Sequence, residues 1–152
     1  IMKYIKKINE QYEDIKITPC EKSKKTYEFI SKYLDTIDIE SYMNNEYLYQ
    51  ICAYSNDELI GISIYRMKDN KIHMNYSAVK EEFRNKGLNK KMKMEIIKIG
   101  KENNCDVITA NVRESNIPSL TSLLNIGFEI NKNVDLKYPD GEKKIPVYLK
   151  LK

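Results

Sequence analysis

The residues best suited to bind an anion lie between positions 79 and 90. An apolar run ends at Val79, and a segment with helical periodicity begins at Leu88, directly after Gly87. Backbone N–H groups at the start of a helix have no partner within the helix, and the helix dipole adds positive potential there. Glycine also permits a left-handed backbone and a close approach. Positive charge is added by three side chains: Arg84, Lys86 and Lys90. The stretch therefore predicts a binding site for a diphosphate.

The same residues also fit an ordinary loop that precedes a surface helix. One glycine and several lysines do not distinguish these two interpretations, so residues 79–90 alone leave both open. A P-loop nucleotidase is not predicted, because the stretch has no Gly-Lys followed by Ser or Thr.

Changes in hydrophobic period along the chain predict the elements that would position this stretch. Apolar residues at spacings of three and four are typical of amphipathic helices, and branched or aromatic segments between short polar turns are typical of an antiparallel meander. The expected helices are 21–37, 39–43, 88–104 and the segment from Asn116 to Gly127; the expected strands are 47–54, 59–67, 72–79, 106–112, 128–134 and 145–151. Residues 2–8 have a strand-like composition but an ambiguous pattern.

Two motifs in this order resemble the GCN5-related N-acetyltransferases, the GNAT family. The first is Val79 followed by Arg84-Asn85-Lys86-Gly87-Leu88-Asn89, which matches the family's Arg/Gln-x-x-Gly-x-Gly/Ala except at its last position. The second is Asn116-Ile117-Pro118-Ser119, followed by Gly127-Phe128. The resemblance implies an α+β protein with the GNAT fold, in which about four helices flank a central mixed, mostly antiparallel sheet. It also implies that residues 1–152 form a single acetyltransferase domain.

By this resemblance the cosubstrate is acetyl-CoA. Backbone N–H groups around 85–90 would bind its diphosphate, the main chain of Val79 would contact the pantetheine or polarise the thioester carbonyl, and Asn116 would contact the pantetheine arm. Asn116 also fits a plain helix cap. Asn89 stands where the family has a small residue, which affects how closely the diphosphate can approach. The implied cofactor-binding residues are Val79, Arg84, Asn85, Lys86, Gly87, Leu88, Asn89, Lys90, Asn116, Ser119 and Leu123.

The resemblance gives less for the catalytic groups. Many family members have a tyrosine seven residues after the motif asparagine, as general acid to the departing thiolate, and this chain has Leu123 there. That pattern is similar to the ribosomal-protein N-terminal acetyltransferases of the RimJ/RimL-like branch, in which Ser119 would be a candidate donor; Ser119 equally fits a residue that caps or packs at a helix start. The candidate bases are His73 and Tyr76 on the strand 72–79, although both also fit structural roles, and a bound water is equally open.

These observations predict an acetyl-CoA-dependent N-acetyltransferase, in which a primary amine of a small molecule or of a protein or peptide attacks directly. Neither a metal nor a cysteine nucleophile is expected. The alternatives are a catalytically weak CoA-binding regulatory module of the same fold and a nucleic-acid-binding domain that uses the lysines of 88–104. The net charge of +4 is only a weak indication of an anionic partner. Neither nucleic acid nor a membrane is therefore expected as a partner, and we expect a cytoplasmic monomer or homodimer.

The three cysteines are expected to be reduced thiols. Cys20, Cys52 and Cys105 are widely spaced, form no Cys-x-x-Cys pair and have only His73 as a possible co-ligand. A disulfide framework or a zinc site is therefore not expected. Cys52 and Cys105 lie in apolar stretches and are expected to be buried as small hydrophobic residues.

Overall fold

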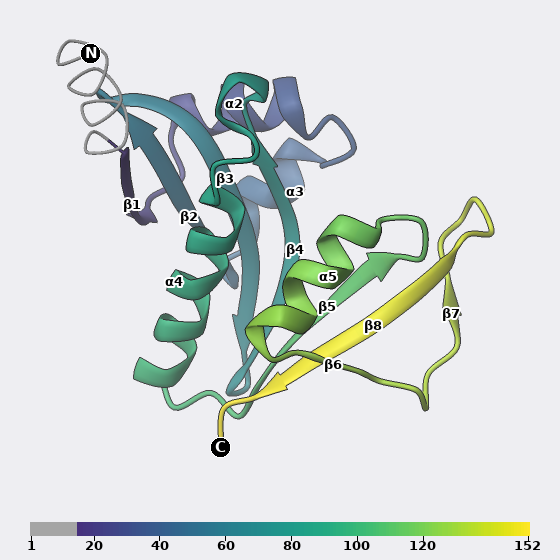
Figure 1. Cartoon of the computed structure of the whole chain (residues 1–152). Helices are drawn as coiled ribbons and strands as arrows, with labels where there is room; N and C mark the ends of the chain where they lie inside the picture. The colour runs from purple at the N-terminus through teal and green to yellow at the C-terminus, as the bar shows by residue number, and fades with distance from the viewer. Residues whose placement is uncertain (1–14) are drawn as a thin grey trace, which may run out of the picture. The chain divides into compact units, whose positions relative to one another are not determined.

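Four α-helices and eight strands make up the part of the chain that the structure describes, residues 15–152 of a computed structural model (Figure 1). The helices are α2 (Lys24–Tyr33), α3 (Ile39–Asn44), α4 (Leu88–Glu102) and α5 (Ile117–Ile126), and a short 3-10 helix, η1 (Glu81–Phe83), precedes α4. The strands are β1 (Ile15–Cys20), β2 (Leu48–Ser55), β3 (Glu58–Lys68), β4 (Lys71–Val79), β5 (Val107–Arg113), β6 (Glu129–Ile130), β7 (Leu136–Lys137) and β8 (Lys143–Lys150). The strand-like segment 2–8 lies outside the described residues.

The strands form one mixed sheet in the order β1-β2-β3-β4-β5-β8-β6, and β7 pairs with β8 outside this path. β4 and β5 run parallel, whereas β1 with β2, and β8 with each of β5, β6 and β7, pair antiparallel. Helix α4 lies between the two parallel strands in the sequence, because a parallel pair needs a long crossover connection. The predicted α+β class, with a mixed, mostly antiparallel sheet and four helices, is confirmed.

The described residues fall into two compact units. Unit 1 contains residues 15–64 and 76–96, and unit 2 contains Tyr65–Asn75 and Ile97–Lys152. Strands β3 and β4 and helix α4 each contribute residues to both units. Each unit has its own set of buried apolar side chains.

In unit 1, two helix caps position α2 and α3. Ser23 and Thr26 form a capping box, in which each side-chain oxygen accepts a hydrogen bond from the other residue's N–H. Asp38 caps α3 by accepting from the N–H groups of Glu40 and Ser41. The first helix is therefore shorter than the predicted 21–37, and the second agrees with its prediction. Both helices contribute to a buried cluster of Phe29, Ile30, Tyr42, Cys52, Leu59, Ile62 and Ile64.

Two-residue turns close both hairpins of the predicted meander. Asn56 and Asp57 join β2 to β3 with φ angles of 49° and 67°, and Asp69 and Asn70 join β3 to β4 with φ angles of 54° and 62°. Both central residues of a type I′ turn need a positive φ, which Asn and Asp tolerate better than most residues. The sequence predicted these turns, and the structure confirms them.

In unit 2, Gly100 of α4 packs closely against the sheet. A Cβ at this position would lie 3.2 Å from Ile72 Cδ1 and 3.5 Å from Ile108 Cδ1. Ile72 and Ile108 are partners in the parallel pairing of β4 with β5, and both are buried. Because side chains alternate across a strand, the next residues, His73 and Thr109, face the other side of the sheet.

The predicted strand 128–134 is too long. β6 pairs with β8 at Glu129 and Ile130, the N–H of Asn131 still donates to the Pro146 carbonyl of β8, and the chain then leaves the sheet before β7 begins. Asn131 Oδ1 accepts from the N–H of Asn133, which forms a local turn in place of a ladder hydrogen bond. The final predicted strand, 145–151, corresponds to β8.

The disulfide between Cys20 and Cys52 corrects the prediction of three reduced thiols. In the antiparallel pairing of β1 with β2, Cys20 lies opposite Gln50 and Thr18 lies opposite Cys52, so the two cysteines are diagonal neighbours with Cα atoms 5.9 Å apart. That separation is within the range that a disulfide spans. The pair was not predicted from the sequence, because no strand was expected directly before the first helix. Cys105 is a free, buried thiol, as predicted.

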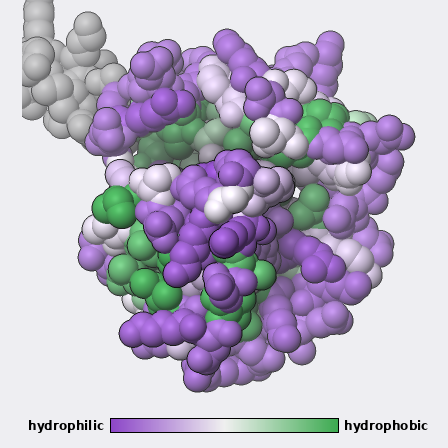
Figure 2. Space-filling view, turned by 90° about the vertical axis from the view of Figure 1, so that its right-hand side faces the viewer, coloured by the Kyte–Doolittle hydropathy of each residue, from purple (hydrophilic) through white to green (hydrophobic). Residues whose placement is uncertain are grey.

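No helix among residues 15–152 is both long and apolar enough to cross a membrane. Figure 2 shows a face of the molecule on which hydrophilic residues predominate and hydrophobic residues gather in small groups. Several large apolar side chains are exposed, and they belong to different elements. They include Met43, Tyr49, Met94, Ile117 and Leu136. Scattered apolar residues of this kind are usual on the surface of a folded protein.

Candidate cofactor and catalytic site

The loop between β4 and α4 leaves a run of backbone N–H groups without partners. Asn85 and Gly87 both have a left-handed backbone, with φ angles of 62° and 76°. The N–H of Lys91 donates to the carbonyl of Gly87, at the start of α4. The N–H groups of residues 85–90 donate to no described acceptor within unit 1. Together with the helix dipole, these groups form a site that attracts an anion.

Gly87 keeps the space beside this loop open. A Cβ at Gly87 would meet no described atom within 4 Å, apart from its chain neighbours, so the space directly beside this backbone is open. The positive φ makes any other residue strained there. Asn85 takes the same backbone region, which asparagine tolerates better than most side chains. The sequence predicted the role of the glycine, but it did not reveal that Asn85 shares its conformation.

The cationic side chains of the loop are not equivalent. Arg84 Nε donates to the carbonyl oxygen of Val79 at 3.0 Å, so this guanidinium braces the loop against the end of β4 and occupies one lone pair of that oxygen. Lys86 Nζ lies 5.3 Å from the centroid of the Phe83 ring, a cation–π contact. Lys90 is exposed in the first turn of α4. Arg84 thus shapes the loop, while Lys86 and Lys90 supply most of its available charge.

Asn89 is tied to the neighbouring strand. Ser77 Oγ donates to Asn89 Oδ1 at 2.7 Å, which links the first turn of α4 to β4. Asn89 replaces the small residue of the GNAT motif, and its carboxamide is large enough to compete for the N–H groups of that turn. The hydrogen bond from Ser77 fixes the carboxamide of Asn89, so this carboxamide cannot rotate to cover the N–H groups of the first turn of α4.

The start of α5 carries the second motif in unit 2. Asn116 Oδ1 accepts from the N–H of Ser119 at 3.3 Å, so Asn116 is the helix cap. Pro118 lies in the first turn, and Gly127 ends the helix with a φ of 117°. Leu123 is only 2% exposed and belongs to the buried part of the unit. An aliphatic side chain cannot donate a proton, so no acid stands at this position.

The two candidate bases differ in their surroundings. His73 Nδ1 lies 2.7 Å from Thr109 Oγ1, so one ring nitrogen is already hydrogen-bonded. Burial lowers the pKa of His73, and the positive charges of Arg66 and Lys144 lower it further. Tyr76 is 43% exposed. His73 is therefore neutral and weakly basic, whereas Tyr76 is accessible.

A network of charged side chains orders the loop that follows β7. The Arg113 guanidinium lies 4.0 Å from the centroid of the Tyr138 ring, and its Nη1 pairs with Asp140 at 2.8 Å and with Glu142 at 3.1 Å. Ser115 hydrogen-bonds Glu142 through both its N–H and its hydroxyl. The pKa of Asp140 is held below its usual value mainly by the hydrogen bond from the N–H of Glu142 and, to a smaller extent, by Arg113. The pKa of Glu142 is lowered mainly by its hydrogen bonds from Ser115 and, to a smaller extent, by Arg113.

The amino-acid sequence gives no sign of this network. An arginine at a strand end and two carboxylates in a later turn give no recognisable spacing. Only the pairing of β8 with both β5 and β7 brings Arg113 to the 138–142 turn.

Comparison with known proteins now decides the family. The model of the Acetyltransferase (GNAT) family matches residues 9–128. The chain belongs to the GNAT family. Its predicted identification as a GNAT acetyltransferase is therefore confirmed, whereas the RimJ/RimL-like branch stays a prediction. Among curated protein sequences there is no match.

Solved GNAT acetyltransferases share the fold. The ribosomal-protein-S18-alanine N-acetyltransferase from Escherichia coli has a TM-score of 0.75 at 16% identity, over 90% of this chain and 94% of that one. A Bacillus subtilis acetyltransferase in complex with CoA has a TM-score of 0.73 at 20% identity, over 91% and 99%. A GNAT acetyltransferase from Elizabethkingia anophelis with acetyl-CoA bound has a TM-score of 0.69 at 19% identity, over 91% and 99%. At such identities the likeness establishes the fold alone.

In this GNAT acetyltransferase, the residues predicted for the cofactor form two groups. Val79 and the stretch Arg84–Lys90 lie together around the start of α4 in unit 1, and Asn116, Ser119 and Leu123 lie on α5 or at its cap in unit 2. Of the predicted catalytic residues, Tyr76 belongs to unit 1, whereas His73 and Ser119 belong to unit 2. His73 is at the start of β4, at the far end of that strand from Val79.

Proposed function

We propose that this GNAT acetyltransferase moves the acetyl group of acetyl-CoA to a primary amine by direct attack in a ternary complex, with residues 1–152 acting as one acetyltransferase domain. The observation that carries the proposal is the loop before α4. There, Asn85 and Gly87 hold the backbone in left-handed conformations, and the N–H groups of residues 85–90 have no described partner in unit 1.

The loop suits the diphosphate of acetyl-CoA. A diphosphate has several anionic oxygens, each of which can accept more than one hydrogen bond, and the consecutive N–H groups of 85–90 can donate to several of them at once. Lys86 and Lys90 would add charge at the rim, and Asn116 would contact the pantetheine arm. Two solved neighbours hold CoA or acetyl-CoA, which agrees with acetyl-CoA as the cosubstrate.

The thiols of the chain favour direct attack over a covalent intermediate. Cys20 and Cys52 are joined to each other, and Cys105 is 2% exposed. Burial, followed by the charge of Asp106, raises the pKa of Cys105, so its thiol is neither accessible nor ionised. The amine nitrogen would therefore attack the acetyl carbonyl carbon of the thioester directly, so that the amide bond forms as the thioester bond breaks.

Proton transfer in this proposal needs no strong acid. The ammonium group first releases one proton to become a nucleophilic amine, and the attacking nitrogen then loses a second one to a base, for which Tyr76, His73 and bound water are the candidates. The departing thiolate gains one proton. A thiol pKa of about 8.5 makes the thiolate a tolerable leaving group near neutral pH. Ser119, at the start of α5, is the candidate donor in place of the tyrosine that Leu123 replaces. Proximity of amine and thioester supplies the main acceleration.

The 138–142 turn is the proposed contact for the acceptor amine, which belongs either to a small molecule or to a protein. Arg113 orders this turn and leaves Asp140 and Glu142 ionised at neutral pH, because their pKa values are lowered. Carboxylates of this kind attract a substrate that carries an ammonium group before it loses its proton.

A second candidate is a catalytically weak CoA-binding module. The observation in its favour is Leu123, which is buried and cannot act as the general acid. This candidate shares the cofactor loop and differs only in turnover.

Calorimetric titration with acetyl-CoA tests the proposed loop. Wild type should bind, and Gly87→Glu should lose about 100-fold or more in affinity, because a carboxylate is placed beside a diphosphate. Gly141→Glu is the matched control, since Gly141 also has a positive φ and no atom within 4 Å of its Cβ position. Equal loss in both variants, or no binding by wild type, would contradict the loop assignment. Turnover with a panel of amines then separates the enzyme from the binding module.

A further inference from the structure

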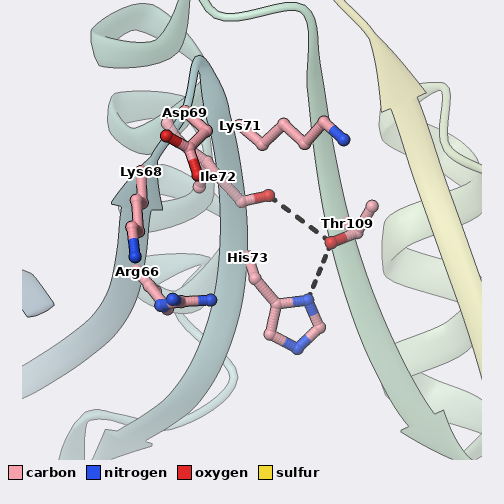
Figure 3. Close-up of a pocket in the computed structure, with 7 residues that line it drawn as sticks. All are labelled: Arg66, Lys68, Asp69, Lys71, Ile72, His73 and Thr109. Carbon is pink, nitrogen blue, oxygen red and sulfur yellow. Dashed lines mark hydrogen bonds between the residues drawn. The ribbon is translucent and has the colours of Figure 1, made fainter. Parts of the chain in front are cut away.

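A pocket of about 350 Å³ lies in unit 2 at the end of the β3–β4 hairpin, and neither the proposed cofactor loop nor the proposed acceptor turn contributes to it. Figure 3 shows its side chains: Arg66 and Lys68 come from β3, His73 from β4, and Thr109 from β5, while Lys71 extends toward β5. The complete lining is Arg66, Lys68, Asp69, Lys71, Ile72, His73 and Thr109. Its volume is at the lower end of the range for small-molecule sites.

The hairpin register concentrates positive charge in this pocket. A two-residue turn at Asp69 and Asn70 makes Lys68 and Lys71 the first cross-strand pair, and two positions further along it places Arg66 opposite His73. Like charges directly opposite each other destabilise a strand pair, so a hairpin selected only for stability would alternate them with acids. An anion bound between Arg66 and Lys71 would be attracted by both of these side chains.

His73 and Thr109 form the polar floor between β4 and β5. They are partners in the parallel ladder, and His73 Nδ1 lies 2.7 Å from Thr109 Oγ1 (Figure 3). Thr109 Oγ1 lies 3.5 Å from the carbonyl oxygen of Ile72, a distance at the limit for a hydrogen bond. The Thr109 hydroxyl donates to this carbonyl, so in the neutral ring its oxygen accepts from the Nδ1–H of His73. Nε2 therefore carries a lone pair in the neutral ring and becomes a donor to a ligand when the ring is protonated.

The charge around His73 is only partly neutralised. Asp69 is the single carboxylate among the lining residues, against the cations Arg66, Lys68 and Lys71. Neither Arg66 nor Lys71 forms an ion pair with the described acids of unit 2. Lys144 of β8 adds a further positive charge that His73 experiences. The balance in the pocket is thus positive, while the His73 ring is itself uncharged.

We propose that this pocket is a second ligand site, which binds a small anion carrying a doubly charged phosphate or dicarboxylate group. Arg66 and Lys71 supply the charge-assisted hydrogen bonds, and His73 donates from Nε2 once the bound anion has favoured its imidazolium form. The site uses residues at the start of β4, among them His73, which is also one of the candidate bases, whereas the cofactor loop follows the end of that strand.

His73 provides a selective readout, because it is the only histidine in the chain. Its imidazole resonances in an NMR spectrum are assigned without ambiguity. Inorganic phosphate and malonate are titrated separately at constant ionic strength, and their relative affinities distinguish a phosphate ligand from a dicarboxylate. We expect a saturable change in the His73 resonances with at least one of the two. A bound anion also raises the pKa of His73, because its negative charge offsets the repulsion between the imidazolium and the nearby cations, which are Arg66, Lys68, Lys71 and Lys144. The charge of Asp69 is present with and without the anion and does not contribute to this change.

Charge-removing variants test the residues. Arg66→Gln and Lys71→Gln should each weaken binding of the anion about tenfold, since each removes a charge-assisted hydrogen bond. Lys98→Gln, an exposed lysine of α4 in the same unit, is the matched control and should bind as wild type does. No response to either anion, or a linear response that is the same in all four proteins, would overturn the proposal. Failure here leaves the acetyl-CoA titration unaffected, so the two proposals fail separately.

Discussion

Between β4 and α4 the candidate anion site consists mainly of backbone N–H groups, whereas the pocket between β3, β4 and β5 consists of side-chain charges. The first depends on two left-handed residues, Asn85 and Gly87, and its lysines are at the rim. The second depends on strand register, which gathers Arg66, Lys71 and His73 in one pocket. A backbone site is therefore broken by changes in conformation, and a side-chain site by changes in charge.

The two units also differ covalently, and this difference gives the largest expected effect. Unit 1 has the Cys20–Cys52 disulfide, and the only thiol of unit 2, Cys105, is free. Replacing both Cys20 and Cys52 by Ser should lower the free energy of unfolding by about 3–4 kcal/mol, from the chain entropy of a loop of this length. Denaturant unfolding under non-reducing conditions measures it.

A reductant provides the control for the disulfide. It should lower the stability of wild type by the same amount and leave the double variant unchanged. If alkylation of the unfolded, unreduced protein modifies three cysteines and not one, the disulfide is absent and does not contribute to the stability of unit 1.

The next effect tests whether conformation alone can break the backbone site. Asn85→Val forces a β-branched residue into a left-handed backbone, which costs on the order of 1–3 kcal/mol and should weaken acetyl-CoA binding about tenfold. No charge changes in this variant. Calorimetric titration is the measurement.

Asn104→Val is the matched control for that experiment. Asn104 has a φ of 56° and follows the end of α4 in unit 2. The substitution should reduce stability to a similar extent while leaving the affinity for acetyl-CoA unchanged. Equal affinities for the two variants would show that the left-handed residue at 85 is structural only.

In unit 2, the charge network at Arg113 allows the opposite test, in which a side-chain charge is changed and the backbone conformation is not. Arg113→Gln removes the ion pairs to Asp140 and Glu142, which hold the 138–142 turn in place. We expect about a fivefold rise in KM for the acceptor amine with an unchanged KM for acetyl-CoA. Steady-state kinetics at low salt measures both constants.

The pH dependence of that effect follows from the carboxyl pKa values. Both are lowered in the folded protein, so the ion pairs are complete at neutral pH and are lost as pH falls through the lowered values. The difference between wild type and Arg113→Gln should therefore shrink in acid. A difference that grows as pH falls would contradict the role of the ion pairs.

The division between backbone and side chains also decides which features could be predicted from the sequence. Elements that local chemistry encodes were predicted: the Asn-Asp and Asp-Asn turns, the Asn116 cap and the Gly87 loop all need particular residues at particular backbone positions. The Asn85 conformation escaped notice, because asparagine is only tolerated in the left-handed region and does not require it.

Features that depend on pairing between distant strands could not be predicted. The disulfide needs β1 beside β2, the Arg113 network needs β8 between β5 and β7, and the pocket at His73 needs the register of β4 with β5. Each needs one contact between residues far apart in the sequence: Arg113 and Asp140 are 27 positions apart, Cys20 and Cys52 are 32 apart, and His73 and Thr109 are 36 apart. No local pattern marks such pairs, so they appear only with the fold.

The smallest expected effect concerns Asn89, the residue that departs from the family motif. If the hydrogen bond from Ser77 holds the Asn89 carboxamide, Ser77→Ala frees it to compete for the N–H groups of the first turn of α4. Acetyl-CoA affinity should then fall about threefold, the equivalent of one neutral hydrogen bond. The double variant Ser77→Ala/Asn89→Ala should recover wild-type affinity, because the competing group is gone. If Ser77→Ala alone binds like wild type, the tether has no role. If the double variant is weaker than the single one, Asn89 contacts the cofactor directly and its departure from the motif is a gain and not a loss for the backbone site.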